Sequence, residues 1–278
     1  MASACAERDP TGRMEDVYDP GGYVGVNDPI EFTDTPYDFT GDSSISDLIG
    51  VAPPFHNIWY GIAQGESYPI AGDCDPGRTN DVTEVQNVAE LPMTIEGVVT
   101  LHPRFFQKIT VCGTDERYYG SYVMQDSTGG IMVLKDSRLA EFDVGDRVRL
   151  RVRGMVKFFS TIAVLAYDEE EVINEPDARY PIYYEQLQRR FLEQDIGLVK
   201  RVRGRVVLEA TNQNFNEMRL ESLDDSSVHW LVTIDRELGT RGVAPALGDV
   251  VELTAPVLDS FGLRMIIGSL GMIEVISQ

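Results

Sequence analysis

The feature that most constrains this sequence is a run of strict alternation, G-D-R-V-R-L-R-V-R-G-M-V, from residue 145 to residue 156. Successive side chains on a β-strand point to opposite faces. A strand here has one wholly aliphatic face and one wholly cationic face, which is typical of a half-buried strand in a small sheet. The cationic positions are Arg147, Arg149, Arg151 and Arg153.

The same pattern recurs later in the chain. The run G-D-V-V-E-L at 248–253 matches G-D-R-V-R-L at 145–150, and R-G-R-V-V at 203–207 matches E-G-V-V-T at 96–100. Within each copy, two further segments lie between these motifs and match their counterparts in the same order. They are Y-V-M-Q-D-S at 122–127 with M-R-L-E-S-L at 218–223, and I-M-V-L at 131–134 with W-L-V-T-I at 230–234. We interpret the agreement in order and spacing as a tandem duplication.

Each copy resembles an OB-fold, the five-stranded Greek-key barrel. The resemblance lies in a glycine within the first strand (Gly97 or Gly204), the hairpin Q-D-S-T-G-G-I, and the Gly-Asp turn before the fourth strand. A glycine in that strand relieves the tight coil of a small barrel. The chain is also similar to OB-like domains of unknown function in bacterial lipoproteins and secreted proteins, whose copies follow a lead-in such as Y-Y-E-Q-L-Q at 183–188.

This resemblance implies an all-β fold of two tandem five-stranded OB-like Greek-key barrels. It also implies a ligand, an oligonucleotide, oligosaccharide or protein, held by the second and third strands and the adjoining loops. The fold alone does not choose among these ligands.

Composition divides the chain into segments. Asp, Pro and Gly dominate near the N-terminus, where too little apolar surface exists to offset the entropy of ordering. Tyr183–Glu193 has helical apolar spacing. We therefore predict a mostly disordered acidic tether at 1–44, an arm packing on the first barrel at 45–90, barrel 1 at 91–175, a helical linker at 176–197 and barrel 2 at 198–278.

The net charge of −21 is unevenly placed. Residues 1–90 hold 17 Asp and Glu against 3 Lys and Arg, whereas the remainder holds 28 against 21. This acidity argues against non-specific nucleic-acid binding by the whole chain. A local basic patch is still compatible with it.

The cysteines suggest an exported protein. Ser-Ala-Cys ending at Cys5 resembles the end of a bacterial lipobox, which would make Cys5 a lipid anchor. The match is incomplete, because Ala2 replaces the usual leucine and no apolar signal precedes it, so a lipid requires a longer precursor. Cys74 and Cys112 flank loops and are expected to form a disulfide in an oxidising compartment. The alternatives are an exposed tail cysteine and two free thiols.

Recognised catalytic signatures are missing from the sequence. It contains no H-E-x-x-H, C-x-x-C, Walker A, G-x-S-x-G or G-x-G-x-x-G motif, and only three histidines, His56, His102 and His229. We therefore expect no enzyme activity, no metal site and no cofactor.

Two sets of residues are candidates for ligand binding. The first is the row Arg147, Arg149, Arg151 and Arg153 with Lys157, continued by Lys200, Arg201, Arg203 and Arg205 in the second copy. The second is aromatic: Phe105, Phe106, Tyr118, Tyr119 and Tyr122 on the first three strands, with Phe158 and Phe159 in the last connection. Rings can stack on bases or sugars, and arginines can hold phosphates. The alternative is that the arginines are the solvated face of a strand, or pair with the protein's own acidic tether.

Two functional hypotheses follow. The first is a non-catalytic lipoprotein of the bacterial cell envelope, periplasmic, outer-membrane anchored or secreted, that binds a protein or glycan. The alternative is a single-stranded nucleic-acid-binding protein, an accessory to a secreted nuclease for example. Contact with a membrane would come only through a lipid on Cys5.

Overall fold

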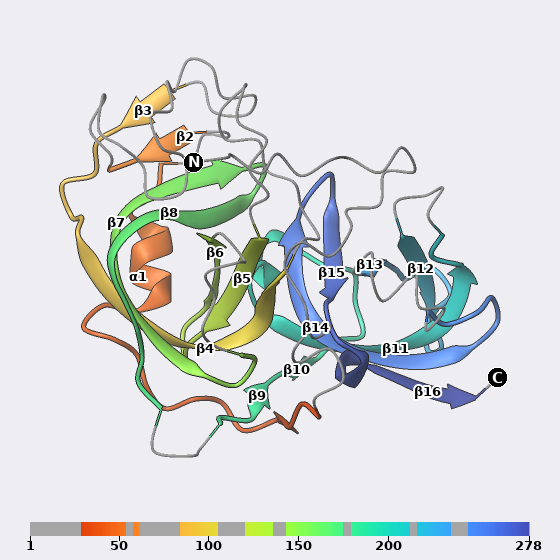
Figure 1. Cartoon of the computed structure of the whole chain (residues 1–278). Helices are drawn as coiled ribbons and strands as arrows, with labels where there is room; N and C mark the ends of the chain where they lie inside the picture. The colour runs from red at the N-terminus through yellow and green to blue at the C-terminus, as the bar shows by residue number, and fades with distance from the viewer. Residues whose placement is uncertain are drawn as a thin grey trace, which may run out of the picture.

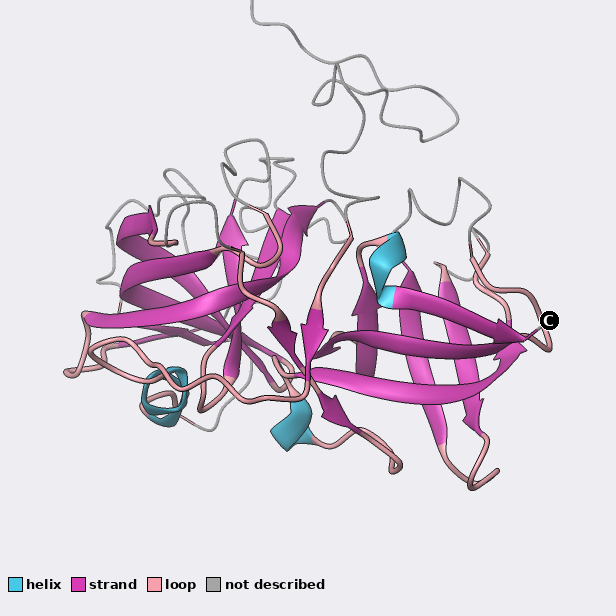
Figure 2. Ribbon diagram, turned by 90° about the horizontal axis from the view of Figure 1, so that it is seen from below, coloured by secondary structure: helices cyan, strands magenta, loops and turns pink. Residues whose placement is uncertain are grey.

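The computed structural model describes residues 29–53, 58–61, 84–104, 120–135, 143–174, 179–211, 216–234 and 244–277. Strands dominate these residues and gather in two groups that lie side by side, while helices are few and short (Figures 1 and 2). No helix in the described part of the chain is long and apolar enough to cross a membrane. The predicted all-β, OB-like fold class is confirmed.

The first group of strands closes into barrel 1. Strand β4 pairs with β5, β5 with β6, β6 with β8 in parallel, β8 with β7, and β7 with β4. This closed order is that of an OB-fold. The strands are β4 (Met93–Arg104), β5 (Gly120–Gln125), β6 (Gly130–Lys135), β7 (Arg147–Phe158) and β8 (Thr161–Val172).

The second group has the same order of pairings and forms barrel 2, with β13 and β15 as its parallel pair. Gly97 of β4 lies opposite Val148, and Gly204 of β11 lies opposite Val251. The matched sequence motifs thus fall on corresponding strands, whereas their origin by duplication stays a prediction. The strands are β11 (Val199–Leu208), β12 (Glu217–Ser222), β13 (His229–Ile234), β14 (Val250–Asp259), β15 (Leu263–Ile267) and the added β16 (Ile273–Ser277).

Alternation along β7 builds the interior of barrel 1. Val148, Leu150 and Val152 are fully buried there, as the sequence predicts. Gly97 faces this interior at close quarters, since a Cβ atom on it would lie 2.9 Å from Met124 Cε and 3.0 Å from the Gln125 carbonyl oxygen. A side chain at Gly97 would therefore need the neighbouring strand to shift.

An N-terminal arm packs on barrel 1. Strand β1 (Phe32–Thr33) pairs with β9 (Ile182–Tyr183), and helix α1 (Ile45–Gly50) buries Ile45 and Leu48 in the barrel 1 core. Strand β2 (Ile58–Tyr60) pairs with β7 and with β3 (Glu84–Gln86).

Residues 29–44 differ from the solvated tether that their composition predicts. The segment is anchored by apolar contacts of Phe32, Tyr37 and Phe39, which a prediction from its acidic composition does not take into account. The Tyr37 hydroxyl donates to the Pro181 carbonyl (3.1 Å) and accepts from the Tyr183 backbone N–H (3.0 Å). Residues 1–28 lie outside the described residues.

The predicted helix at Tyr183–Glu193 is wrong. The segment contains β9, β10 (Glu185–Gln186) and a single 3-10 turn at Glu193–Asp195. Leu187 and Phe191 are buried, so the apolar spacing marked a real contact. Sheet pairing decides the backbone conformation, because β10 pairs with β11 and the Leu187 N–H donates to the Arg201 carbonyl (2.8 Å).

The two barrels share one core. Val123, Met132 and Leu134, on the outer faces of β5 and β6, belong to the same buried cluster as the barrel 2 interior. Gly130 and Gly197 meet backbone to backbone, so a Cβ atom on either would overlap the carbonyl oxygen of the other. The Val199 N–H also donates to Gln125 Oε1 (2.9 Å). This packing fixes the barrels against each other.

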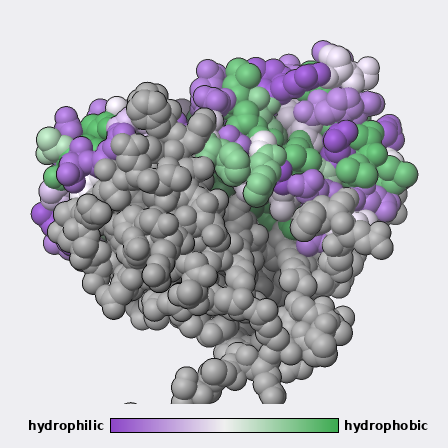
Figure 3. All heavy atoms as spheres, turned by 90° about the horizontal axis from the view of Figure 1, so that it is seen from above, coloured by the Kyte–Doolittle hydropathy of each residue, from purple (hydrophilic) through white to green (hydrophobic). Residues whose placement is uncertain are grey.

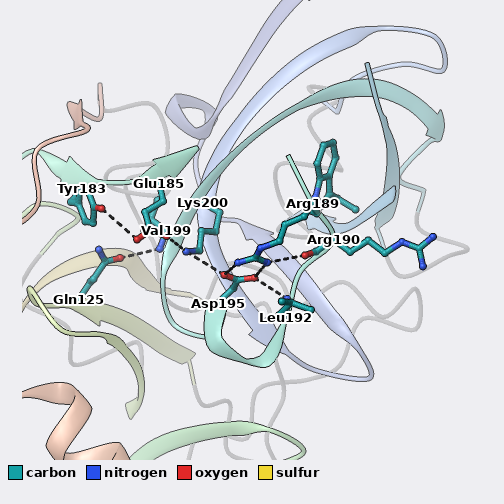
Figure 4. A network of polar contacts seen from close by, with 10 residues as sticks. Gln125, Tyr183, Glu185, Arg189, Arg190, Leu192, Asp195, Val199 and Lys200 are labelled. Atoms are coloured by element: carbon teal, nitrogen blue, oxygen red, sulfur yellow. Dashed lines mark hydrogen bonds and ion pairs between the residues drawn. The ribbon is translucent and has the colours of Figure 1, made fainter. Parts of the chain in front are cut away.

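A buried ionic network fastens the linker at the same junction (Figure 4). The Asp195 carboxylate, only 1% exposed, accepts from the Arg189 guanidinium (2.6 and 2.9 Å) and the Leu192 N–H (2.8 Å). Lys200 lies 3.3 Å from Asp195 and also pairs with Glu185. Burial would raise the pKa of Asp195, but these donors and the charge on Lys200 outweigh it and hold that pKa below its usual value.

We predict that Gly130→Ala destabilises the protein by about 2–3 kcal/mol, because the added methyl group has only backbone to displace. Thermal unfolding measures this loss. Gly50→Ala is the matched control, since a Cβ atom there meets nothing within 4 Å. Equal melting temperatures for the two variants would contradict the close packing of the barrels.

Candidate binding site

The cationic face of β7 is paired with the protein's own carboxylates. Glu96 of β4 accepts from Arg147 (2.6 Å) and Arg149 (2.8 Å). Asp168 of β8 pairs with Arg151 and with Arg153 (3.3 Å). The flanking strands thus supply acids to both sides of the arginine row, and the hydrogen bond and charge of Glu96 raise the pKa of Arg149. A ligand role for the row stays a prediction.

The N-terminal arm also covers one end of this row. The Arg147 guanidinium carbon lies 3.8 Å from the centroid of the Phe39 ring and 6.0 Å from that of Tyr180. Such stacking over a ring is favourable for a guanidinium group. Arg147 is therefore held between Glu96 and the arm.

Of the aromatic candidates on the first three strands, only Tyr122 has a described side chain, and it is not at the surface. Tyr122 is 0% exposed in the barrel 1 core, and its hydroxyl donates to Glu170 Oε1 (3.1 Å). The prediction that Tyr122 contacts a ligand is wrong, because β5 turns this side chain inward. The other candidates lie outside the described residues, as do the cysteines: Phe105, Phe106, Tyr118, Tyr119, Cys5, Cys74 and Cys112.

The surface where an OB-fold holds its ligand differs between the barrels. In barrel 1 this surface belongs to β5 and β6, and barrel 2 packs on it, so Val123, Met132 and Leu134 are buried. In barrel 2 the outer faces of β12 and β13 carry exposed Arg219 and His229. Among the described residues, this surface is therefore covered in barrel 1 and uncovered in barrel 2.

Three arginines line this open surface: Arg203 and Arg205 on β11 and Arg219 on β12. All three are exposed, and among the described residues none has a carboxylate oxygen within 4 Å of its guanidinium nitrogens. Arg205 donates to the Gly248 carbonyl (2.8 Å). We call the outer surface of β11, β12 and β13 the arginine face. Lys200, predicted to extend it, is buried in the linker network instead.

Acids border the arginine face without neutralising it. Glu221 lies opposite Arg205 in register, and Glu252 lies opposite Arg203. Glu252 is engaged by Arg201 (3.4 Å), which also stacks on Tyr184 at 3.6 Å from the ring centroid.

An aromatic pair stands at the junction of the barrels. Phe159, in the β7–β8 turn, and Phe261, in the β14–β15 turn, have ring centroids 5.0 Å apart. They are 40% and 83% exposed, and both have left-handed backbones with φ of +51° and +59°. Such backbones are uncommon for aromatic residues and occur often at functional sites. We call these two residues the phenylalanine pair.

Hydrogen bonds across the junction hold the pair together. The Ser160 N–H donates to Asp259 Oδ2 (3.0 Å), and the Thr161 hydroxyl donates to the Asp259 carbonyl (3.0 Å). Arg264, beside the Phe261 turn, pairs with Glu217 and donates to Thr233 Oγ1 (3.2 Å). The turn is thereby attached to the end of the arginine face. Figure 1 shows the β14–β15 hairpin between the barrels, and in the upper part of Figure 3 green apolar side chains reach the surface among purple hydrophilic ones.

Sequence reasoning missed Phe261 and Arg219. A signal for Phe261 existed, because K-F-F-S at 157–160 and D-S-F-G at 259–262 occupy the same hairpin of the two copies. Arg219 is a lone arginine in M-R-L-E-S-L, and only the pairing of β12 beside β11 groups it with Arg203 and Arg205. In the described part of the chain, no group of three or more His, Cys, Asp or Glu could hold a metal ion.

No protein-family model and no curated protein matches this sequence. Among solved structures, the tetrameric p202 HIN2 is similar over 66% of this chain and 92% of its own, with 12% identity and a TM-score of 0.31. The single-stranded DNA binding protein from Thermus aquaticus aligns over 66% and 92%, with 11% identity and a TM-score of 0.22. A replication protein A heterotrimer bound to ssDNA aligns over 67% and 48%, with 13% identity and a TM-score of 0.28. At these values the likeness does not identify a ligand.

Burial of Tyr122 predicts a pH effect. Burial raises its pKa well above the usual value of about 10, and burial raises the pKa of Tyr60 and Tyr167 to about 12. A group with a raised folded-state pKa gives stability that is present below the unfolded pKa and is lost as the pH rises above it. The fold should therefore weaken above about pH 10.

Tyr122→Phe removes one of these groups and should move the alkaline unfolding midpoint upward. At pH 7 the same change should cost about 1 kcal/mol, because the hydrogen bond to Glu170 is lost. Phenolate absorbance and circular dichroism, recorded together against pH, measure both effects. A Tyr122 phenol that ionises in the folded protein near pH 10 would contradict its burial.

Proposed function

We propose that this chain is a non-catalytic binding protein that holds single-stranded nucleic acid on the arginine face of barrel 2, with bases stacking on the phenylalanine pair. The observation that carries the proposal is a row of three exposed arginines without carboxylate partners in the described part of a chain of net charge −21. A local cationic surface in so acidic a protein suits an anionic ligand.

The arginine face offers contacts for a phosphate backbone. Arg203 and Arg205 lie two residues apart on β11, and Arg219 lies opposite the end of that strand, in register with Leu208. Side chains two residues apart on a strand share one face. A backbone crossing β11 and β12 would meet all three guanidinium groups, which bind phosphate oxygens well.

The phenylalanine pair offers a stacking surface. Every base has an aromatic face, so stacking tolerates any sequence and contributes about 1–3 kcal/mol per base. Arg264 links the turn of Phe261 to Glu217 and Thr233 on β12 and β13. A nucleic-acid strand bound on the arginine face would therefore meet the phenylalanine pair at one end.

Barrel 1 is less suited to this role. Its arginine row is paired with Glu96 and Asp168, so a phosphate would compete with existing partners. Its second and third strands lie under barrel 2.

A glycan or protein ligand in a bacterial envelope is the second candidate. The phenylalanine pair favours it, since an apolar surface of this kind binds without needing an anionic partner, and the charge of −21 repels nucleic acid at long range. Lipid attachment at Cys5 and export belong to this candidate. Salt dependence separates the two, because phosphate contacts release counterions and uncharged ligands do not.

We predict that fluorescence anisotropy detects binding of labelled oligothymidylate at about 50 mM salt, with affinity falling steeply as salt rises. The double variant Arg203→Ala/Arg219→Ala should weaken binding and flatten the salt slope by about 0.7 for each lost contact. Arg149→Ala/Arg151→Ala is the matched control, because it removes the same charge from the paired row on β7.

Phe261→Ala should act differently from the arginine changes. It should weaken binding by about 1–3 kcal/mol at every salt concentration and leave the slope unchanged, since stacking releases no counterions. Absence of oligonucleotide binding at about 50 mM salt would sink the proposal, because electrostatic attraction is strongest there. Equal losses from the two arginine double variants would remove the arginine face as the site.

A further inference from the structure

We infer that the outer edge of β16 (Ile273–Ser277) binds an extended, basic segment of a partner polypeptide, which adds a strand to the sheet of barrel 2. This interaction surface is separate from the arginine face and does not depend on the proposed function. It rests on the open edge, the exposed apolar side chains and the charge of this strand.

The edge of β16 is open. β16 is last in the strand order of its sheet and pairs with β14 on one side, and among the described residues no strand pairs with its other side. Figure 1 shows β16 along the lower edge of barrel 2, next to the C-terminus. An edge strand presents unpaired N–H and C=O groups, and an extended peptide can hydrogen-bond to them.

The corresponding edge of barrel 1 is protected by charge. There the second half of β8 pairs with the beginning of β7, as β16 pairs with the beginning of β14. That half of β8 reads D-E-E-E at 168–171, and a row of charges discourages strand addition. β16 reads I-E-V-I-S and carries a single charge. The same edge is therefore highly charged in barrel 1 and nearly uncharged in barrel 2.

Apolar side chains on this edge are partly uncovered. Val275 is 46% exposed although it lies opposite Val251, which is fully buried in the shared core. Ile276, the next residue, is 39% exposed. Successive residues of a strand point to opposite faces, so an added strand would cover apolar surface on both.

The charge of Glu274 favours a basic segment as the binding partner of this edge. Glu274 lies directly opposite Glu252 in register, and Glu252 is paired with Arg201. In the described residues Glu274 has no ion pair. A Lys or Arg opposite Glu274 would be favoured, as opposite charges across strands are. A second copy of this chain is disfavoured by repulsion between two molecules of net charge −21.

The test uses the full chain and the peptide acetyl-Lys-Val-Lys-Val-Lys-Val-amide. Hydrogen exchange should slow at residues 273–277 when the peptide is added, and isothermal titration should give a measurable affinity. The acidic peptide with Glu in place of Lys should not bind. A Lys-Val peptide with N-methyl groups on alternate amides should bind far less, because it cannot complete the ladder.

Variants locate the site. Glu274→Lys should weaken binding by at least about fivefold, through loss of an exposed ion pair and gain of a repulsion. Glu169→Lys, the same change on the β8 edge, should bind as the wild type does. Ile276→Lys places a charge on the apolar face of the edge and gives a second test should Glu274→Lys fold poorly.

Four results would overturn the inference. They are unchanged exchange at 273–277, equal binding of the acidic peptide, equal losses from Glu274→Lys and Glu169→Lys, and sedimentation showing that two copies of the chain associate through β16. None of these bears on oligonucleotide binding, so the proposed function stands or falls separately.

Discussion

The structure depends on one contact, the backbone approach of Gly130 to Gly197. A side chain at either glycine would hold β6 and the start of barrel 2 apart. With no side chain there, the outer faces of β5 and β6 meet the second barrel and join its core. Two barrels with one hydrophobic core cannot turn freely against each other, since any rotation would expose that core to water. The buried Asp195 network then fixes the linker that crosses this junction.

This contact also explains why the two barrels differ in their surfaces. Barrel 1 gives up the outer faces of β5 and β6 to the junction, and its exposed arginines are matched by Glu96, Asp168 and Glu171 on neighbouring strands. Exposed pairs of this kind contribute little to stability, about 0–1 kcal/mol each. Their main effect is to place a carboxylate beside each arginine of the β7 row. In the part of the chain that the structure describes, nothing packs on the outer faces of β12 and β13 as barrel 2 packs on β5 and β6, and the arginine face is exposed.

Local sequence patterns correctly predicted which side chains of β7 face the core and where the first strand of each barrel lies. Alternation placed Val148, Leu150 and Val152 inside, and the repeated glycines marked the first strand of each barrel. The acids that pair with Arg149 could not be found this way, because Glu96 and Glu171 are distant in sequence and only the pairing of β4 and β8 with β7 makes them neighbours. The error at Tyr122 has a similar cause.

Tyr122 begins the run Y-V-M, in which the tyrosine and the methionine face inward and Val123 faces outward. Since both faces of β5 are buried, polarity along that strand does not distinguish interior from exterior. The prediction of a helix in the linker was wrong for a related reason. Its apolar spacing located Leu187 and Phe191 in the core, but pairing with β11 made the backbone extended. For the linker, the burial of Leu187 and Phe191 could be predicted from the sequence, whereas the sheet partner that makes the backbone extended could not.

The phenylalanine pair follows from the duplicated hairpins and the junction together. Phe159 and Phe261 occupy the same turn in the two barrels, and neither barrel alone would bring two such rings within 5.0 Å. Asp259 of barrel 2 accepts from Ser160 and Thr161 of barrel 1, so the turns are positioned by each other. Both phenylalanines have left-handed backbones, a conformation that costs free energy and is retained where the surrounding contacts hold it in place. The pair is thus a property of the assembled chain, because its two rings come from different barrels and the turns that carry them are joined through Asp259.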